Sequence, residues 1–269
     1  MTSRNLLVAL AASTMLATPL AAATIGSFDD SRTVGNWYLT GAKYDSLSAT
    51  IEGSGSTIAE ATSVITSEYL DGVDAFYTGS IDSDARTDGH STDAELLALQ
   101  SWVSAGGLLV IGGENAKFTD NANSWMNAFG LTLTAGKHSE GTFSNSSHAL
   151  MDGVTAGAEL GALSGGAFAD GDFDILASTD GGAAIVAKSY GLGTVVALAD
   201  GNFWDDGPSR GEKRYSENTA QFAANLFGAE QPLRSAITLP SPVPLPASLP
   251  LALAGLGGLL ALRRKRAAA

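Results

Sequence analysis

A helix pattern followed at once by a wholly apolar run constrains the fold of this chain more than any other feature. Thr92 stands three residues before Glu95, which is the spacing of a capping box, and apolar residues then recur at helical spacing. Gly106 and Gly107 end this pattern, and residues 108–111 are all apolar. A strand that is apolar at every position is typical of a sheet covered on both faces. The pattern therefore predicts a helix packed against a buried strand.

The rest of the central region alternates short apolar stretches with helix patterns. We predict strands at residues 24–28, 56–64, 74–79, 131–134, 174–177, 183–187 and 194–199, and further helices at 44–52, 123–129 and 216–227. Because a strand, a helix and a second buried strand in this order form a βαβ unit, we expect an α/β fold with a mostly parallel sheet flanked by helices. The turn at 191–193 predicts a hairpin between the last two strands.

The composition excludes several kinds of chemistry. The chain has no cysteine, which excludes disulfides, thiolate nucleophiles and Cys-ligated zinc. All 28 acidic residues lie between Asp29 and Glu230, and only ten Lys and Arg residues lie between Arg4 and Arg263, so this region has a formal charge of −18. Such a surface repels phosphate backbones, so nucleic acid is not expected as a partner.

The first residues have the three-part layout of a secretory signal peptide. Arg4 is followed by an apolar run at 6–12, and residues 21–23 are all Ala, which suits a cleavage site. We predict a signal peptide at 1–23, cleaved within two residues of Ala23. The alternative is a buried first helix.

The other end combines a proline-rich stretch, an apolar segment and a basic cluster. Four prolines within 240–246 disfavour helix and sheet, so residues 231–247 are expected to form an extended spacer. The apolar stretch behind it barely reaches the roughly 20 residues that span a bilayer. We predict a C-terminal transmembrane helix within 248–269, with its basic end on the cytoplasmic side.

These three parts, in this order, resemble the VPLPA-CTERM variant of the PEP-CTERM sorting signals. The residues that carry the resemblance are Val243, Pro244, Leu245, Pro246, Ala247, Arg263, Arg264, Lys265 and Arg266. Proteins with such tails are exported by Gram-negative bacteria and processed by a membrane protease-transpeptidase, the exosortase. The resemblance covers about the last 27 residues. It implies passage through the inner membrane, cleavage near the proline motif, and transfer to the cell surface, the outer envelope or the extracellular space.

Four stretches of the central region resemble the class I glutamine amidotransferase-like fold, a flavodoxin-like architecture, in its divergent ThuA-like and DUF4350 forms. They are residues 99–113, 148–154, 190–202 and 218–226. The resemblance implies one α/β domain over residues 24–230. The nucleophile of that family is a cysteine, so the absence of cysteine here excludes glutaminase chemistry by that route.

Polar residues follow two of the predicted buried strands. The residues concerned are Gly113, Glu114, Asn115, Asp200 and Asn202. In open α/β sheets, ligands bind at the carboxyl ends of the strands. We therefore predict that these two loops face each other across one crevice, with Glu114 and Asp200 as polar contacts of a ligand. The alternative is that the same residues cap helices and close turns.

Acidic residues also crowd one polar stretch before the predicted helix. Asp82, Asp84 and Asp88 lie close to His90 and Asp93. Oxygen ligands at this density suit calcium, which is the one candidate cofactor, although the spacing is not that of an EF-hand. The alternative is a solvated loop whose acidic residues cap the next helix.

Two further signals for catalysis have a weak context. Residues 207–211 match GxSxG but lack a strand directly before them and a helix directly after them. His148 stands where the ThuA-like relatives that the central region resembles have a His-Pro-type turn, and this resemblance implies a structural role. His148 would form a catalytic pair with Glu114 only if the tertiary structure brought the two side chains together.

The sequence thus favours an exported, C-terminally sorted or anchored envelope protein that displays a non-catalytic α/β binding domain. The expected partners are the membrane, an exosortase-type enzyme, and an extracellular matrix or polysaccharide. One alternative is an extracytoplasmic hydrolase that uses the Glu114/Asp200 crevice on carbohydrate or amide substrates. Another is a calcium-stabilised adhesive or matrix module. The absence of a cysteine nucleophile and of a convincing triad argues against an enzyme.

Overall fold

The computed structural model describes residues 22–81, 89–115, 118–144, 146–160, 163–206 and 215–229. All of them belong to the unit formed by residues 1–233. The expected spacer and sorting segment, residues 1–21 of the expected leader, and the GxSxG residues 207–211 lie outside the described residues. The same holds for the candidate calcium ligands Asp82, Asp84 and Asp88.

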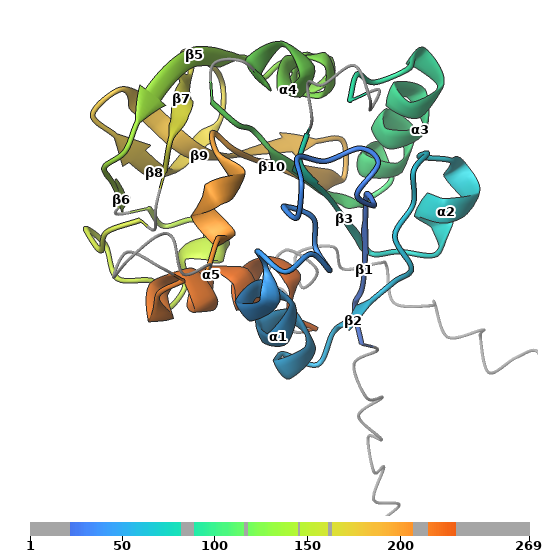
Figure 1. Cartoon of the computed structure of the whole chain (residues 1–269), viewed down its shortest axis with the longest axis horizontal. Helices are drawn as coiled ribbons and strands as arrows, with labels where there is room; N and C mark the ends of the chain where they lie inside the picture. The colour runs from blue at the N-terminus through green and yellow to red at the C-terminus, as the bar shows by residue number, and fades with distance from the viewer. Residues whose placement is uncertain are drawn as a thin grey trace, which may run out of the picture. The chain divides into compact units, whose positions relative to one another are not determined.

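A single mixed sheet organises the described residues (Figure 1). Its strands are β1 (Thr24–Ser27), β2 (Thr57–Ile58), β3 (Ala75–Ser80), β4 (Leu108–Gly112), β5 (Leu133–His138), β6 (Gly141–Phe143), β7 (Gly165–Phe168), β8 (Asp174–Thr179), β9 (Gly182–Tyr190) and β10 (Gly193–Leu198). The order along the sheet is β2-β1-β3-β4-β10-β9-β7-β5, and β8 pairs with β9 and with β6. The long central strands place the polar loops considered below at one edge of the sheet.

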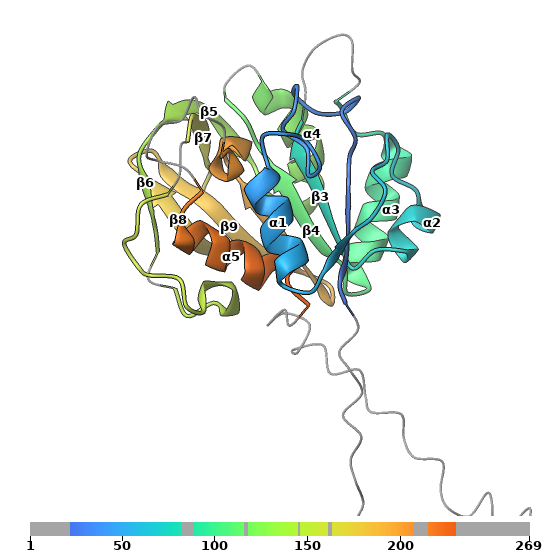
Figure 2. The same ribbon diagram turned by 60° about the horizontal axis from the view of Figure 1, so that its bottom comes forward.

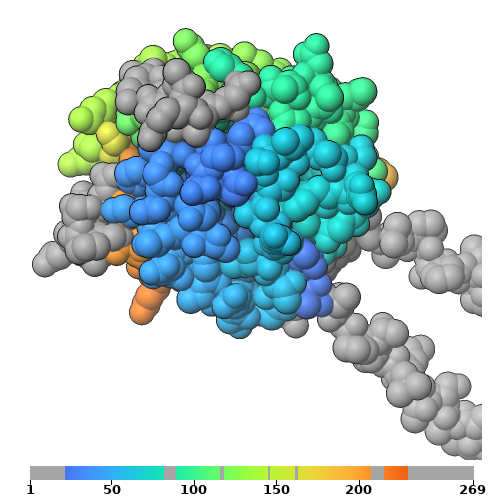
Figure 3. Space-filling view, turned by 45° about the vertical axis from the view of Figure 1, so that its right-hand side comes forward, coloured from blue at the N-terminus to red at the C-terminus, as the bar shows by residue number. Residues whose placement is uncertain are grey.

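Helices cover both faces of this sheet. They are α1 (Asp45–Gly53), α2 (Ser67–Asp71), α3 (Asp93–Ser104), α4 (Thr119–Met126) and α5 (Glu217–Phe227), with the 3-10 turns η2 (Asn127–Phe129), η3 (Ala149–Met151) and η4 (Gly201–Trp204). Figure 2 shows α1 and α5 side by side on one face, and α2 and α3 pack together on the other. In Figure 3 the N-terminal third of the unit, coloured blue to cyan, covers one side as a continuous surface.

The unit that the sequence predicted most clearly is confirmed in detail. The Thr92 side chain accepts a hydrogen bond from the Glu95 N–H, and the Glu95 carboxylate accepts one from the Thr92 N–H, so the capping box is complete. The helix buries Leu99 and Val103, one turn apart on one face. Strand β4 is buried at all five positions, as expected for a strand covered on both faces.

The parallel character is confined to one half of the sheet. Strands β2, β1, β3, β4 and β10 are parallel neighbours, whereas β9, β7, β5, β8 and β6 pair antiparallel. The change of direction occurs at the predicted hairpin, where Tyr190 pairs with Gly193 across a two-residue turn. Gly191 has φ 62° there, in the left-handed region that a glycine adopts without strain.

Several short elements differ from the prediction. The strand expected over 56–64 forms only at Thr57–Ile58. Beyond it, the chain makes one isolated bridge, at Thr62. The elements α2, β6 and β7 were not predicted from the sequence. Strand β6 has three residues and β7 begins with two glycines, so neither gives a clear alternation of apolar and polar residues. Whether such segments form strands depends on their pairing with distant parts of the chain.

The core on the α1–α5 face is built from aromatic side chains. Trp204 stacks on Phe222 at a ring-centroid distance of 6.0 Å, and Phe203 contacts Trp204 at 4.4 Å. Phe203 and Trp204 both belong to η4, which follows β10. Their packing on Phe222 therefore holds the loop at the carboxyl end of β10 against α5. Among the described residues, none of the helices combines the length and apolar character needed to cross a membrane.

Candidate functional site

The two polar loops predicted to face each other do meet in the structure. Strands β4 and β10 are parallel neighbours, with Gly112 opposite Leu198. Beyond them the Gly113 N–H donates to the Leu198 carbonyl at 2.7 Å, and the Gly201 N–H donates to the Gly113 carbonyl at 2.8 Å. The backbones of the two loops are therefore hydrogen-bonded to each other at the carboxyl edge of the sheet.

Gly113 permits this close approach. A Cβ atom at position 113 would lie 2.7 Å from the Leu198 carbonyl oxygen and 2.9 Å from the Ala199 carbonyl oxygen. Real Cβ atoms do not approach backbone oxygens so closely, and the backbone has little room to move inside a sheet. The absence of a side chain is thus a condition for the contact between the loops.

Asp200 is an interior carboxylate that accepts hydrogen bonds from its own loop and from the segment before β7. Its side chain is 0% exposed. Oδ1 accepts the Asn202 N–H at 2.8 Å, and Oδ2 accepts the Asn202 side-chain amide at 3.2 Å and the Ser164 N–H. The contact with Asn202 caps η4 at its first turn. Asp200 therefore closes the turn after β10, which is the structural role that the sequence analysis held as its alternative.

Glu114 is held inside in a similar way. It is 3% exposed, and its Oε1 accepts the Asn115 N–H at 2.9 Å and the Asn115 side-chain amide at 2.8 Å. Gly113 and Asn202 are buried as well, and Asn115 is partly buried. All five predicted site residues thus lie at the carboxyl ends of β4 and β10, and they point into the protein more than into a crevice.

Burial and the nearby charge of Glu114 set the protonation of Asp200. Burial, reinforced by the negative charge of Glu114, raises the pKa of Asp200 to about 7. The hydrogen bonds from Asn202 and Ser164 oppose this shift but do not cancel it. The carboxyl group of Asp200 therefore takes up a proton near neutral pH, which is the range in which a general acid or base works.

Two buried tyrosines complete the interior cluster. The Tyr77 hydroxyl donates to the Tyr44 hydroxyl at 3.3 Å, and the Tyr44 hydroxyl donates to the Gly201 carbonyl at 2.9 Å. Burial raises the pKa of both phenols, reinforced at Tyr44 chiefly by Tyr77 and at Tyr77 by the negative charges of Asp200 and Glu114, so both stay protonated donors. Neither residue was predicted from the sequence, although polar residues inside the apolar strand β3 were a usable signal for Tyr77.

The hollow beside Asp200 is too narrow for a ligand in this conformation. It is lined by His138, Leu163, Thr179, Asp200 and the small residues Gly165, Gly166, Ala184 and Ala199. It does not admit a water molecule, since no point inside it can hold the centre of a water-sized sphere. His138, one of the lining residues, contacts Asp180, with 2.9 Å between Nδ1 and Oδ1.

The other acidic residues after β10 are also engaged in the fold. Asp205 is buried and lies 4.0 Å from the Lys43 ammonium, measured from Oδ1 to Nζ. Asp206 accepts the Ser46 N–H at 2.6 Å, in the first turn of α1. The negative charge at a helix N-terminus stabilises that helix. These contacts join the loop after β10 to α1.

The histidines do not form a metal site among the described residues. His148 caps η3, with Nδ1 accepting the Leu150 N–H at 3.2 Å, which confirms the structural role expected for it. His90 is exposed, and its carbonyl accepts a hydrogen bond from Arg32. Within the described ranges no group of three or more His, Cys, Asp or Glu residues could hold a metal ion.

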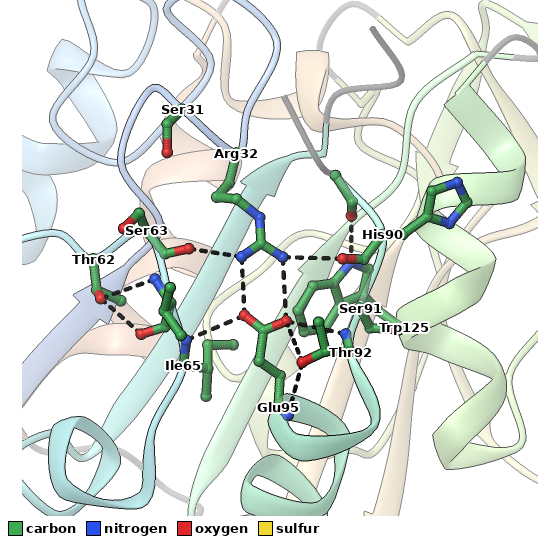
Figure 4. A network of polar contacts seen from close by, with 12 residues as sticks. Ser31, Arg32, Thr62, Ser63, Ile65, His90, Ser91, Thr92, Glu95 and Trp125 are labelled. Carbon is green, nitrogen blue, oxygen red and sulfur yellow. Dashed lines mark hydrogen bonds and ion pairs between the residues drawn. The ribbon is translucent and has the colours of Figure 1, made fainter. Parts of the chain in front are cut away.

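A buried ion pair that sequence reasoning missed lies at the same edge of the sheet (Figure 4). Arg32 donates to Glu95 at 2.9 Å, to the Ser63 carbonyl at 2.6 Å and to the His90 carbonyl at 3.1 Å. Its guanidinium also lies over the rings of Phe28, at 4.6 Å, and Trp125, at 5.5 Å. Arg32 thereby joins the segments that follow β1 and β2 to those that begin α3 and form α4.

Glu95 accepts hydrogen bonds from three sides. Besides Arg32, the N–H groups of Ile65 and Thr92 donate to it at 3.2 Å and 3.0 Å. Burial alone would raise the pKa of Glu95, but the hydrogen bond from Arg32, the two backbone donors and the Arg32 charge together hold it below its ordinary value. A single side chain thus closes a capping box and neutralises a buried cation.

Comparison with known proteins gives structural likeness only. No family model matches the chain, and no curated protein matches it in sequence. The mmIFT52 N-terminal domain is 16% identical with a TM-score of 0.57, over 76% of this chain and 95% of that one. The cytoplasmic protein STM1381 from Salmonella typhimurium LT2 is 17% identical with a TM-score of 0.53, over 76% and 97%. A ThuA-like protein from Bacteroides uniformis ATCC 8492 is 12% identical with a TM-score of 0.50, over 78% and 91%.

At such identities the likeness concerns the fold and carries no activity or ligand from one protein to another. It agrees with the ThuA-like resemblance of the central region. The VPLPA-CTERM resemblance of the tail stays a prediction. The chain therefore has a fold of the kind found in ThuA-like proteins, an α/β sheet flanked by helices.

Proposed function

We propose that this chain is an exported envelope protein whose α/β domain is a non-catalytic binding module. Export and sorting rest on the sequence of the two ends: the signal-peptide layout of residues 1–23 and the VPLPA-CTERM-like tail from Val243 to Arg266. The tail would be processed by an exosortase-type enzyme at the inner membrane. The domain would then be displayed at the cell surface or in an extracellular matrix, with polysaccharide as a candidate partner.

One observation carries the non-catalytic part of this proposal. Both carboxylates at the carboxyl edge, Glu114 and Asp200, are closed into the protein and bonded to the N–H groups of neighbouring backbone. A catalytic carboxylate has to reach the atom that it protonates or deprotonates. Groups that are 3% and 0% exposed and already hydrogen-bonded support a role in holding the loops together.

The export proposal is tested by expressing the full chain in a Gram-negative host that has an exosortase system. Fractionation followed by intact-mass measurement should find a species that lacks the leader and the Arg263–Arg266 cluster in the envelope or the medium. A matched chain with Ser at positions 263–266 should stay unprocessed at its C-terminus. Recovery of the unprocessed 27.3 kDa chain from the cytoplasm would contradict the proposal.

The pKa of Asp200 favours a second candidate, an extracytoplasmic hydrolase acting on carbohydrate or amide bonds. A carboxyl group with a pKa raised to about 7 beside a second carboxylate is a typical pair for general acid and base catalysis. This candidate requires the loops after β4 and β10 to open.

The two candidates separate in an activity screen with matched variants. A hydrolase would release product from a panel of polysaccharides and peptides and lose at least about 100-fold in rate in Asp200→Asn. Its rate would depend on pH with a midpoint near the raised pKa of Asp200. If the domain is a binding module, neither the wild type nor Asp200→Asn should release product. The retention of the protein on isolated extracellular polysaccharide should be the same for the wild type and Glu114→Gln.

A further inference from the structure

We propose that the leader is removed at the Ala23–Thr24 bond and that Asp74 receives the new N-terminus. This inference rests on the proposed export of the chain. The predicted cleavage region spans a few residues around Ala23, and sequence alone leaves the bond open. The contacts at the start of β1 distinguish these bonds from one another.

Thr24 is the first residue of β1, which lies between β2 and β3 in the sheet (Figure 1). Its N–H donates to Asp74 Oδ2 at 2.8 Å, and the Asp74 N–H donates to the Thr24 carbonyl at 2.8 Å. Asp74 directly precedes β3. Two hydrogen bonds thus join Thr24 to Asp74. The acceptor for the Thr24 nitrogen is the Asp74 carboxylate.

Cleavage changes the charge at this position. Hydrolysis adds the oxygen of one water to the Ala23 carbonyl carbon, and Ala23 leaves with the leader as a carboxylate. The Thr24 nitrogen takes up protons and becomes an ammonium group, which is largely charged at neutral pH. The nitrogen that lies 2.8 Å from Asp74 in the uncut chain would then form an ion pair with it.

The neighbouring bonds fit less well. A cut between Ala22 and Ala23 would place the ammonium group on Ala23, one residue before the nitrogen that donates to Asp74. A cut after Ala23 also leaves Ala21 and Ala23 at the two positions where signal cleavage needs small residues. Its cost is the burial of Ala23, which is 0% exposed, and the two hydrogen bonds that the Ala23 carbonyl accepts from Thr57, from the N–H at 2.7 Å and from the hydroxyl at 3.4 Å. Thr57 lies on the edge strand β2, where water can replace that acceptor.

The first test is N-terminal sequencing of the protein recovered from the envelope after expression of the full precursor. We expect Thr24 as the first residue. Ala22, Ala23 or any other new first residue would overturn this inference and leave the proposed export intact. Met1 as the first residue of all recovered protein would instead overturn the proposed export.

The second test measures the pKa of the α-amino group in the processed protein by NMR. The Asp74 carboxylate should raise it above the ordinary range of about 7.7–8.0, by about 0.5 pH unit for an exposed pair. Asp74→Asn should abolish the increase, whereas Asp71→Asn, which removes another exposed charge at the end of α2, should preserve it. The ion pair between the α-amino group and Asp74 should stabilise the folded protein fully at pH values below the ordinary pKa of the α-amino group. This stabilisation should disappear as pH rises through the raised pKa.

A screening measurement covers the case in which Asp74→Asn fails to accumulate. In the processed wild-type protein, about 1 M NaCl should lower the α-amino pKa toward the ordinary range, because salt screens exposed charges. An α-amino pKa that does not respond to salt, or that is equal in wild type and Asp74→Asn, would show that Asp74 does not receive the N-terminus.

Discussion

Arg32 and Glu95 show how one pair of residues holds segments that are far apart in the sequence. The pair is almost fully buried, and its hydrogen bonds reach Ser63, Ile65 and the His90 carbonyl. A buried pair of this kind contributes little compared with an apolar pair of the same shape, but losing one member leaves an uncompensated charge in the interior. Its net effect is to fix the relative positions of the loops that it joins.

Glu95→Gln should therefore destabilise the domain by about 3–5 kcal/mol, because Arg32 would stay buried without a counter-charge. Urea unfolding followed by circular dichroism measures the change. Because the folded pKa of Glu95 lies below its ordinary value, the stabilisation is present above that ordinary value and is lost as pH falls through the folded pKa.

Glu68→Gln is the matched control, since Glu68 is an exposed residue in the first turn of α2. It should change the free energy of unfolding by less than about 0.5 kcal/mol. The double variant Arg32→Met with Glu95→Leu should recover much of the loss. Equal losses in Glu95→Gln and Glu68→Gln would mean that the ion pair does not matter for stability.

Asp200 provides a second prediction at this scale, on pH dependence. Its folded pKa is raised to about 7, whereas an unfolded aspartate has a pKa of about 3.9. Between these values the folded state binds more protons, so the free energy of unfolding should decrease as pH rises from about 4 to about 7, by up to about 1.4 kcal/mol per pH unit.

Glu114→Gln should weaken this pH dependence, because the charge of Glu114 is the second cause of the raised pKa. Unfolding curves at a series of pH values, compared between wild type and variant, measure the difference. Identical slopes would show that the two carboxylates do not influence each other.

At the scale of elements, the contact between the loops after β4 and β10 depends on a missing side chain. Gly113→Ala should cost about 1–3 kcal/mol, since its Cβ would overlap the carbonyl oxygens of Leu198 and Ala199. Gly53, at the end of α1, is the control, because a Cβ there meets no atom within 4 Å. Gly53→Ala should be neutral or stabilising by up to about 1 kcal/mol. Similar thermal unfolding of the two variants would argue against the close approach.

At the scale of the whole molecule, acidic residues outnumber basic ones by 13. Like charges repel in the folded state, and salt screens that repulsion. The melting temperature should therefore rise when the salt concentration is increased from about 20 mM to about 300 mM. The rise should be the same for NaCl and for KCl.

A comparison of calcium with magnesium distinguishes general screening of the surface charges from specific binding of calcium. At matched ionic strength, CaCl2 and MgCl2 at about 1 mM should give the same melting temperature. A rise specific to calcium would indicate an oxygen-ligand site and favour the calcium-stabilised module, for which Asp82, Asp84 and Asp88 remain the candidate ligands.

The elements that could be predicted are those specified by neighbours in the chain. The capping box of α3, the wholly apolar strand β4 and the Gly191–Leu192 turn each involve residues a few positions apart. The same holds for α5, where the Ser216 side chain accepts the Thr219 N–H. The predicted site residues also met, because adjacent parallel strands end at one edge of a sheet.

What the sequence determined by itself was therefore local: helix ends, buried strands, the hairpin and the charge of the surface. Only the tertiary structure decided that half of the sheet is antiparallel, that Arg32 pairs with Glu95 63 positions away, and that Glu114 and Asp200 lie inside the protein. The physical reason is that burial and long-range pairing depend on which segments meet in space. A carboxylate has the same residue type whether it faces water or is enclosed by the N–H groups of a distant loop.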